Sequence, residues 1–183
     1  MGKIKETSFK MKNGKTILMR TVQEGDAQAY LELSKAIMAE NIYSITGEEE
    51  LIISLEKQSA WLKDHIDNEN KLNIVAEFDG MLVGQLDFVS AEIKRISHTG
   101  EFGMGIHKDF RGQGIGSLLL QTLIDWANAH PILEKINLMV HQTNDRAIAI
   151  YEKHGFKIEG IRRREIKYSA DHYVDAVLMG RQL

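Results

Sequence analysis

One short run of the sequence holds residue types that suit the binding of a diphosphate. The run Arg111-Gly112-Gln113-Gly114-Ile115-Gly116 follows a strand-like stretch that ends near Ile106, and it precedes a helix predicted over residues 117–130. A glycine-rich turn in this place exposes several backbone N–H groups, and the helix N-terminus adds partial positive charge. Arg111 adds a full positive charge. We therefore predict a pyrophosphate site at residues 111–117.

The spacing of the glycines distinguishes the known phosphate-binding loops. Glycines at 112, 114 and 116 do not fit the dinucleotide fingerprint G-x-G-x-x-G, and the P-loop lysine is absent because Ser117 follows Gly116. Arg111, Gly114 and Gly116 do match the pattern Arg/Gln-x-x-Gly-x-Gly/Ala. This pattern resembles the coenzyme A pyrophosphate loop of the GNAT-type N-acetyltransferases. The alternative is a helix-entry turn with incidental glycines.

A second motif favours the coenzyme A loop. Residues 144–156 read Asn-Asp-Arg-Ala-Ile-Ala-Ile-Tyr-Glu-Lys-His-Gly-Phe. They resemble the later GNAT pattern Asn-x-x-Ala-x-x-x-Tyr-x-x-x-Gly-Phe, and one helix and one strand separate the two motifs, as in the family. The resemblance covers roughly residue 16 to the C-terminus. It is nearest to the branch that contains protein N-terminal and polyamine acetyltransferases.

Composition excludes several other classes of protein. The chain has 183 residues, a net charge of −3, seven histidines and no cysteine. The negative charge argues against a nucleic-acid partner. The lack of cysteine excludes disulfides, thiolate metal sites and a cysteine nucleophile, and the unclustered histidines predict no metal site. No apolar run reaches the about 18 residues of a membrane span and no secretory signal is recognisable, so we expect a cytoplasmic location.

The predicted elements follow the order of a GNAT domain. Hydrophobic periodicity from residue 16 onward predicts β-α-α-β-β-β-α-β-α-β-β, with Asp79-Gly80 as a hairpin turn. The resemblance implies one α/β (α+β) domain over residues 16–183. Its mixed central sheet is expected to have about seven strands, with helices on both faces.

The N-terminal segment and the start of the second helix carry local sequence signals. Residues 1–15 are polar and lysine-rich, and they are predicted to be an N-terminal extension or an edge hairpin. Thr46, with Glu49 three residues later, is predicted to cap a helix that runs to about Asn68.

The resemblance implies an N-acetyltransferase in which a primary amine attacks acetyl-CoA directly, without an acyl-enzyme. Acetyl-CoA is then a co-substrate, and its pantetheine arm lies in a slot where the strand before the loop splays from strand 135–141. Gly103 and Gly105 fit a strand that a ligand approaches closely, although plain strand glycines are the alternative. The predicted cofactor-binding residues are Met104, Gly105, Ile106, Arg111, Gly112, Gln113, Gly114, Ile115, Gly116, Ser117, Asn144 and Tyr151.

Asn144 and Tyr151 lie seven residues apart, on one face of the predicted helix. The position of Asn144 supports a helix N-cap, and the resemblance adds a contact to the pantetheine arm. The resemblance makes Tyr151 the general acid that protonates the coenzyme A thiolate. A phenol, with a pKa of about 10, stays protonated at neutral pH. The alternative is a core tyrosine with a satisfied hydroxyl.

Glu101 is the predicted base or water-orienting carboxylate. In the ribosomal-protein alanine acetyltransferases a glutamate precedes the asparagine by five residues, but Met139 occupies that position here. Glu101 is expected on the strand face opposite Phe102, where many GNAT enzymes have a glutamate that orients a water. The alternative is a surface carboxylate at a strand end. His98 and His141 are weaker candidates.

The acceptor is predicted to be a primary amine, carried by a small molecule, a polyamine or a peptide N-terminus. The acidic residues Glu48, Glu49, Glu50 and Glu56 suit a cation, although a helix dipole explains at least the first three as acids at a helix start. A non-catalytic acyl-CoA-binding module or sensor is the alternative function. The spacing of the glycines in the loop argues against a second alternative, a nucleotide-binding protein. No nucleic-acid or membrane partner is expected. A homodimer is one possible oligomeric state, and the sequence does not decide it.

Overall fold

One mixed sheet organises residues 2–40, 42–45 and 54–183, which the computed structural model describes. The strands are β1 (Thr7–Lys10), β2 (Thr16–Thr21), β3 (Lys71–Phe78), β4 (Met81–Ser90), β5 (Thr99–Ile106), β6 (Lys135–His141), β7 (Lys157–Lys167) and β8 (Tyr173–Gln182). The α-helices are α1 (Ala27–Met38), α2 (Leu55–Asp67), α3 (Ile115–Asn128) and α4 (Asp145–Lys153). Among these described residues the strand order is β1-β2-β3-β4-β5-β6-β8-β7.

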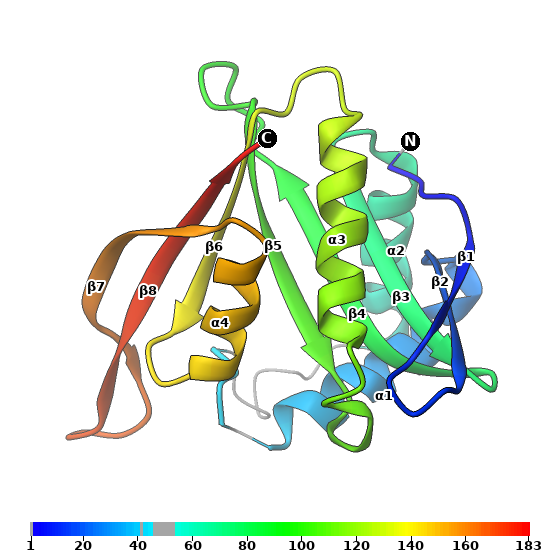
Figure 1. The fold of residues 1–183 in the computed structure, drawn as a ribbon, viewed down its shortest axis with the longest axis horizontal. Coiled ribbons are helices and arrows are strands. Elements are labelled where there is room, and N and C mark those ends of the chain that lie inside the picture. The colour runs from blue at the N-terminus through cyan, green and yellow to red at the C-terminus, as the bar shows by residue number, and fades with distance from the viewer. Residues whose placement is uncertain (1, 41, 46–53) are drawn as a thin grey trace.

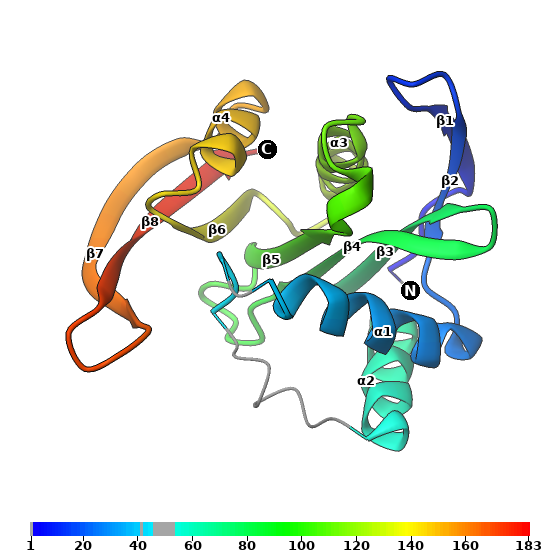
Figure 2. The ribbon, with the colours of Figure 1, turned by 90° about the horizontal axis from the view of Figure 1, so that it is seen from below.

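The predicted fold class is confirmed, with one difference in strand number. Helices α3 and α4 cover one face of the sheet, and α1 and α2 cover the other (Figure 1, Figure 2). The sheet has eight strands rather than about seven. The added strand is β1, whose pairing with β2 runs from Thr7↔Met19 to Lys10↔Thr16. The sequence predicted an N-terminal extension or an edge hairpin for residues 1–15, and β1 pairs with β2 at the edge of the sheet.

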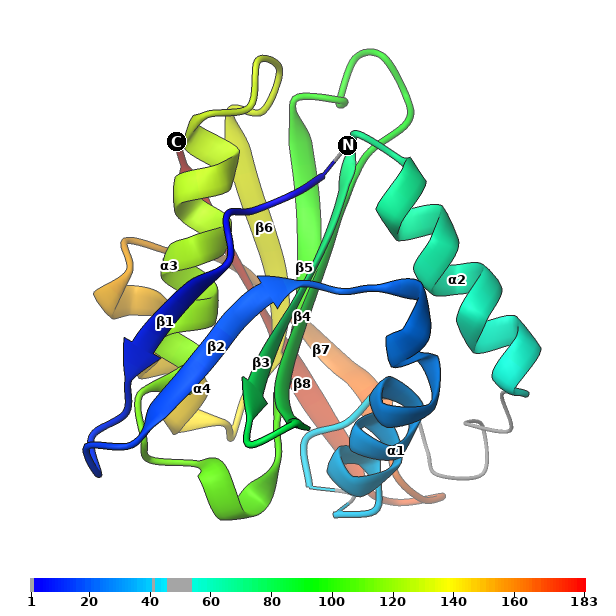
Figure 3. The ribbon, with the colours of Figure 1, turned by 90° about the vertical axis from the view of Figure 1, so that its right-hand side faces the viewer.

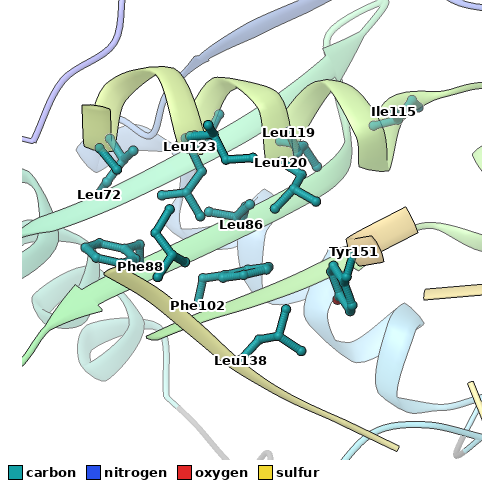
Figure 4. Close-up of a cluster of buried hydrophobic side chains, with 14 of the residues drawn as sticks. Leu72, Leu86, Phe88, Phe102, Ile115, Leu119, Leu120, Leu123, Leu138 and Tyr151 are labelled. Atoms are coloured by element: carbon teal, nitrogen blue, oxygen red, sulfur yellow. The ribbon is translucent and has the colours of Figure 1, made fainter. Parts of the chain in front are cut away.

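The larger hydrophobic core lies between the sheet and α3. Leu119 and Leu123 of α3 are fully buried in one cluster with Leu86 and Phe88 of β4 (Figure 4). Each such side chain contributes about 1.5–3 kcal/mol when it leaves water. The helix that follows the glycine loop is therefore firmly packed on the sheet.

One helix start differs from the sequence-based prediction, and a second predicted start is not described. Helix α3 begins at Ile115 rather than at residue 117, because Gly114 takes the left-handed N-cap conformation with φ 91°. The predicted cap of the second helix, Thr46 with Glu49, lies outside the described residues. The helix that the structure describes begins at Leu55, and the Ser54 hydroxyl accepts the N–H of Lys57 at 3.3 Å.

Pairing between β5 and β6 covers only the first part of each strand. The parallel register ends at Glu101↔Asn137, although β5 continues to Ile106 and β6 to His141. The two strands diverge beyond that pair (Figure 1). The backbones of β5 and β6 are therefore unpaired directly before the glycine loop, and we call this break in the ladder the opening.

The N-terminal hairpin supports the loop from the other side. Its strands β1 and β2 form one edge of the sheet (Figure 3). The N–H of Lys12 donates to the carbonyl of Gln113 at 3.2 Å, and the N–H of Asn13 donates to the side-chain oxygen of Gln113 at 3.1 Å.

None of the described helices is both long and apolar enough to span a membrane.

Candidate active site

The loop between β5 and α3 presents unpaired backbone donors. Gly112 and Gly114 have φ values of 81° and 91°, which glycine adopts without a clash at Cβ. Within the described residues, the N–H groups of 112–114 donate no hydrogen bond. The N–H groups of the first turn of α3, at 115–117, have no acceptor within a helix. Together with the helix dipole, these donors suit a bound diphosphate.

Gly116 sets the distance between α3 and β5. A Cβ at this position would lie 3.2 Å from Cδ1 of Ile106 and 3.6 Å from Cε of Met104. The lack of a side chain therefore lets the first turn of α3 pack directly on the end of β5. This contact places the loop donors next to the opening between β5 and β6.

Arg111 has a partner that the sequence did not indicate. Its Nη1 and Nη2 each donate to the carboxylate of Glu40 at 2.7 Å, and its Nε donates to the carbonyl of Ile106 at 3.1 Å. The positive charge that the sequence assigned to the diphosphate is thus offset by Glu40. The backbone N–H groups are left as the main anion donors of the loop.

Met104, Gly105 and Ile106 lie on the part of β5 that has left β6. They pair with β4 on one side, as in Met104↔Leu86, but have no strand partner toward β6. An extended ligand can use such a free strand edge for hydrogen bonds. One group is already taken, because the carbonyl of Ile106 accepts from Arg111.

Tyr151 projects from α4 toward the junction of β5 and β6 (Figure 4). Its ring lies 5.8 Å from the ring of Phe102 and 6.0 Å from that of Phe156, between centroids. Burial raises the pKa of its hydroxyl to about 12, so the phenol is protonated at neutral pH. Within the described residues the hydroxyl forms no hydrogen bond. Its oxygen is partly accessible to solvent, because it is not one of the fully buried polar atoms that have no partner. The hydroxyl is therefore available to a ligand.

Asn144 is the N-cap of α4. Its Oδ1 accepts the N–H of Ala147 at 3.2 Å. This bond uses the side-chain oxygen alone. The amide nitrogen donates no hydrogen bond to the described residues, so a second contact by this side chain is sterically and chemically open.

Glu101 lies on the α1 and α2 face of the sheet, opposite the buried Phe102. Its side chain is exposed, and it neighbours Asn137 across the last pair of the β5–β6 ladder. The Oδ1 of Asn137 is buried and has no partner among the described residues. Further along this face, Ile37 of α1 covers Gly105, because a Cβ there would lie 2.7 Å from Cδ1 of Ile37. Glu101 and Ile37 therefore lie on the same face of the sheet, beside the end of the β5–β6 ladder.

Asp87 is a polar residue of this face that the sequence-based analysis missed. It lies in β4 directly opposite Gly103. Its Oδ1 is 3.1 Å from the position of a Cβ on Gly103. Burial raises the pKa of this carboxyl to about 6. The available signal in the sequence is that Asp87, between Leu86 and Phe88, is the one charged residue of β4.

The two candidate histidines take structural positions. His141 is buried at the end of β6, where its Nδ1 lies 2.9 Å from the hydroxyl of Thr143, and burial lowers its pKa. His98 precedes β5, and its carbonyl accepts the N–H groups of Glu134 and Lys135. Among the described residues, no three His, Asp or Glu side chains gather in a way that could hold a metal ion.

Sequence comparison identifies relatives of known family. Residues 38–156 match the model of the "Acetyltransferase (GNAT) family". The chain is 31% identical over 121 residues to the L-amino acid N-acetyltransferase AaaT of Escherichia coli (strain K12), covering 66% of this chain and 74% of that protein. It is 31% identical over 96 residues to the spermidine N(1)-acetyltransferase of the same strain, covering 52% of this chain and 50% of that protein.

Solved structures share the fold over nearly the whole chain. The acetyltransferase of the GNAT family from Streptococcus pneumoniae superposes with a TM-score of 0.87 and 28% identity, covering 91% of this chain and 99% of that one. The structure of yncA from Salmonella typhimurium with its cofactor acetyl-CoA has a TM-score of 0.81 at 18% identity, over 92% and 95% of the two chains. At that identity the likeness shows the fold alone. The chain therefore belongs to the GNAT family and is an acetyl-CoA-dependent N-acetyltransferase.

Proposed function

We propose that the chain transfers the acetyl group of acetyl-CoA to a primary amine by direct attack of the amine on the thioester. The observation that carries this proposal is the end of the β5–β6 ladder at Glu101 and Asn137, directly before a loop with unpaired N–H groups. A thin, extended acyl-pantetheine chain fits an opening between strands, and the diphosphate fits the loop.

Donor binding is divided between three groups of residues. The loop from Arg111 to Ser117 holds the diphosphate, mainly through the backbone. The free edge of β5 from Met104 to Ile106 pairs with the pantetheine arm. The side-chain amide of Asn144, whose nitrogen is unused, reaches the same arm from α4.

The proton steps use two residues on opposite faces of the sheet. Tyr151 on the α4 side donates a proton to the leaving thiolate, because its hydroxyl is protonated and unpaired. Glu101 on the α1 side orients the amine, or a water that takes its proton. No covalent enzyme intermediate is needed, which agrees with a chain that has no cysteine.

The acceptor is a primary amine, and its class is the open part of the proposal. The names of the two bacterial relatives specify an L-amino acid and a polyamine, and both of these carry a primary amine. A peptide N-terminus is the third class to be tested. The cytoplasmic location expected from the sequence stays a prediction.

Thiol release from acetyl-CoA across a panel of amino acids, polyamines and short peptides tests the proposal. At least one class should release coenzyme A above the rate without amine, and mass spectrometry should find the acetylated amine. Acetyl-CoA binding without turnover by any amine would instead favour the non-catalytic binding module. The absence of any binding heat at millimolar acetyl-CoA would contradict both.

A further inference from the structure

We propose that Asp87, in the middle of β4, is the carboxylate that receives the acceptor's ammonium group and takes its proton before the amine attacks. This inference rests on the proposed transfer to a primary amine. It assigns a proton acceptor to the α1 side of the opening, deeper in the sheet than Glu101.

The position of Asp87 follows from the register of the sheet. Asp87 pairs with Gly103, which is the next residue on this face of β5 after Glu101, where pairing with β6 ends. The Oδ1 of Asp87 is 3.1 Å from the point where a Cβ of Gly103 would stand. The carboxylate therefore leans over β5 toward the opening, and Gly103 places no side chain in its way.

Among the described residues, no cation pairs with Asp87, and no side chain donates a hydrogen bond to its carboxylate. Asn73, directly opposite on β3, instead donates from its Nδ2 to the hydroxyl of Tyr30 at 3.3 Å. By contrast, the charge of the half-buried Asp26 is compensated within the protein, because Nη1 of Arg20 lies 2.7 Å from its carboxylate. A carboxylate held away from water without a partner is costly, and a ligand ammonium offsets that cost.

A second carboxylate lies on the same face. Glu101 and Asp87 are diagonal neighbours across the β4–β5 ladder, which corresponds to about 7–8 Å, so an ammonium can approach both. The two carboxylates flank Gly103, and both can accept hydrogen bonds from a primary ammonium.

The charges around Asp87 allow it to stay ionised at neutral pH and to act as a base. The titratable groups on the neighbouring elements are Tyr30 of α1, whose pKa burial raises, Glu101 of β5, the buried His65 of α2, whose pKa burial lowers, and Lys71 of β3. Lys71 is the cation of this group, and its charge is offset by an ion pair with Asp64 of α2. With a pKa near 6, the Asp87 carboxylate is a stronger base than an ordinary aspartate.

The protons and electron pairs balance along this route. The ammonium gives one proton to Asp87, which returns it to water. The nitrogen lone pair then forms the N–C bond as the C–S bond breaks and its electron pair passes to sulfur. Tyr151 gives its proton to sulfur, and the second proton of the nitrogen restores the tyrosine through water. The net products are an amide, coenzyme A and one proton in solution.

Substitution of Asp87 by Asn, with Asp125→Asn as the control, tests the role in turnover. Asp125 is an exposed carboxylate on α3, on the other face of the sheet. With an amine that the parent acetylates, Asp87→Asn should lower kcat/KM by about 10²-fold or more and remove the acid limb of the pH–rate profile near pH 6. The Kd for acetyl-CoA should stay within about two-fold. Gly103→Ala keeps the carboxylate but crowds it, and should raise KM for the amine.

A carboxyl NMR titration gives a readout that does not require turnover. In the complex with coenzyme A, methylammonium should lower the pKa of Asp87 from near 6, whereas sodium chloride at equal ionic strength should not. An unchanged titration with methylammonium contradicts the inference. So does an Asp87→Asn variant with the parent's kcat/KM and pH profile, which leaves the proposed transfer intact. A parent enzyme that binds acetyl-CoA but acetylates no amine contradicts the proposed function, and the NMR titration then still decides whether Asp87 binds an ammonium.

Discussion

The carboxylate of Glu40, just after α1, accepts two hydrogen bonds of 2.7 Å from the guanidinium of Arg111. This bidentate pair ties the segment after α1 to the loop before α3. The charge of Arg111 is therefore matched within the protein, and we propose that the pair braces the loop rather than leaving Arg111 free for the diphosphate.

A double-mutant cycle separates this brace from direct phosphate binding. If Arg111 acts through Glu40, Arg111→Gln and Glu40→Gln should weaken acetyl-CoA binding by similar factors, and the double variant should bind no worse than either. Titration calorimetry gives the three Kd values. An Arg111 variant that loses far more affinity than the Glu40 variant would show direct contact with the diphosphate.

Gly114→Ala should abolish acetyl-CoA binding and leave the fold intact. Gly114 has φ 91° with nothing within 4 Å of an added Cβ, and Gly80, in the β3–β4 turn, has φ 79° with equally open surroundings. Gly80→Ala is thus a matched control that carries a similar backbone strain of about 1–2 kcal/mol. Both variants should lose a few degrees of Tm. Equal acetyl-CoA affinity in the two would argue against the loop as the binding site.

Tyr151→Phe should lower turnover by about 10²–10⁴-fold while acetyl-CoA binds nearly as before. The phenylalanine ring keeps the contacts with Phe102 and Phe156, so thermal stability should change little. Single-turnover kinetics with a saturating amine measure the effect on chemistry. A variant with the parent's turnover number would assign the proton of the thiolate to water or to another residue.

Glu101→Gln should reduce turnover most at low pH, where the amine most needs help to lose its proton. Because Glu101 is exposed and Asp87 is the deeper carboxylate, the loss should be smaller than that of Asp87→Asn. The pH–rate profiles of the two variants, measured with one amine, give this order. A profile identical to that of the parent would return Glu101 to an ordinary strand residue.

Asp87→Asn should stabilise the protein at neutral pH although it impairs function. Because burial raises the folded-state pKa of Asp87 to about 6, ionisation disfavours the folded state above that pH. The penalty is fully present above the folded pKa and absent below the unfolded value of about 4. Urea unfolding should therefore show an advantage of the variant at about pH 8 that shrinks to nothing by about pH 4. A constant difference, or the same trend in Asp125→Asn, would contradict this account.

The features that the sequence predicted well are those that local chemistry determines. Helix-entry glycines, the Asn144 cap and the strand over 135–141 depend on residues close together in the chain. The Asp79-Gly80 turn, with φ values of 48° and 79°, is of the same kind. Short-range rules describe such features because the partners lie within a few residues.

The missed features depend on distant partners. Glu40 and Arg111 are 71 residues apart in the sequence, so neither position signals the pair. The place of Asp87 beside the opening depends on its register with Gly103, which a single strand does not specify. The sequence left residues 1–15 as an extension or an edge hairpin, because only the pairing of β1 with β2 decides between the two.

The stoichiometry of one reaction tests the central claim most directly. A parent enzyme supplied with acetyl-CoA and the best amine of the panel should release one coenzyme A thiol for each acetylated amine, and neither product should form without the amine. Thiol titration and mass spectrometry of the same sample measure the two products. Binding of acetyl-CoA with no acetylated amine from any acceptor class would contradict the account.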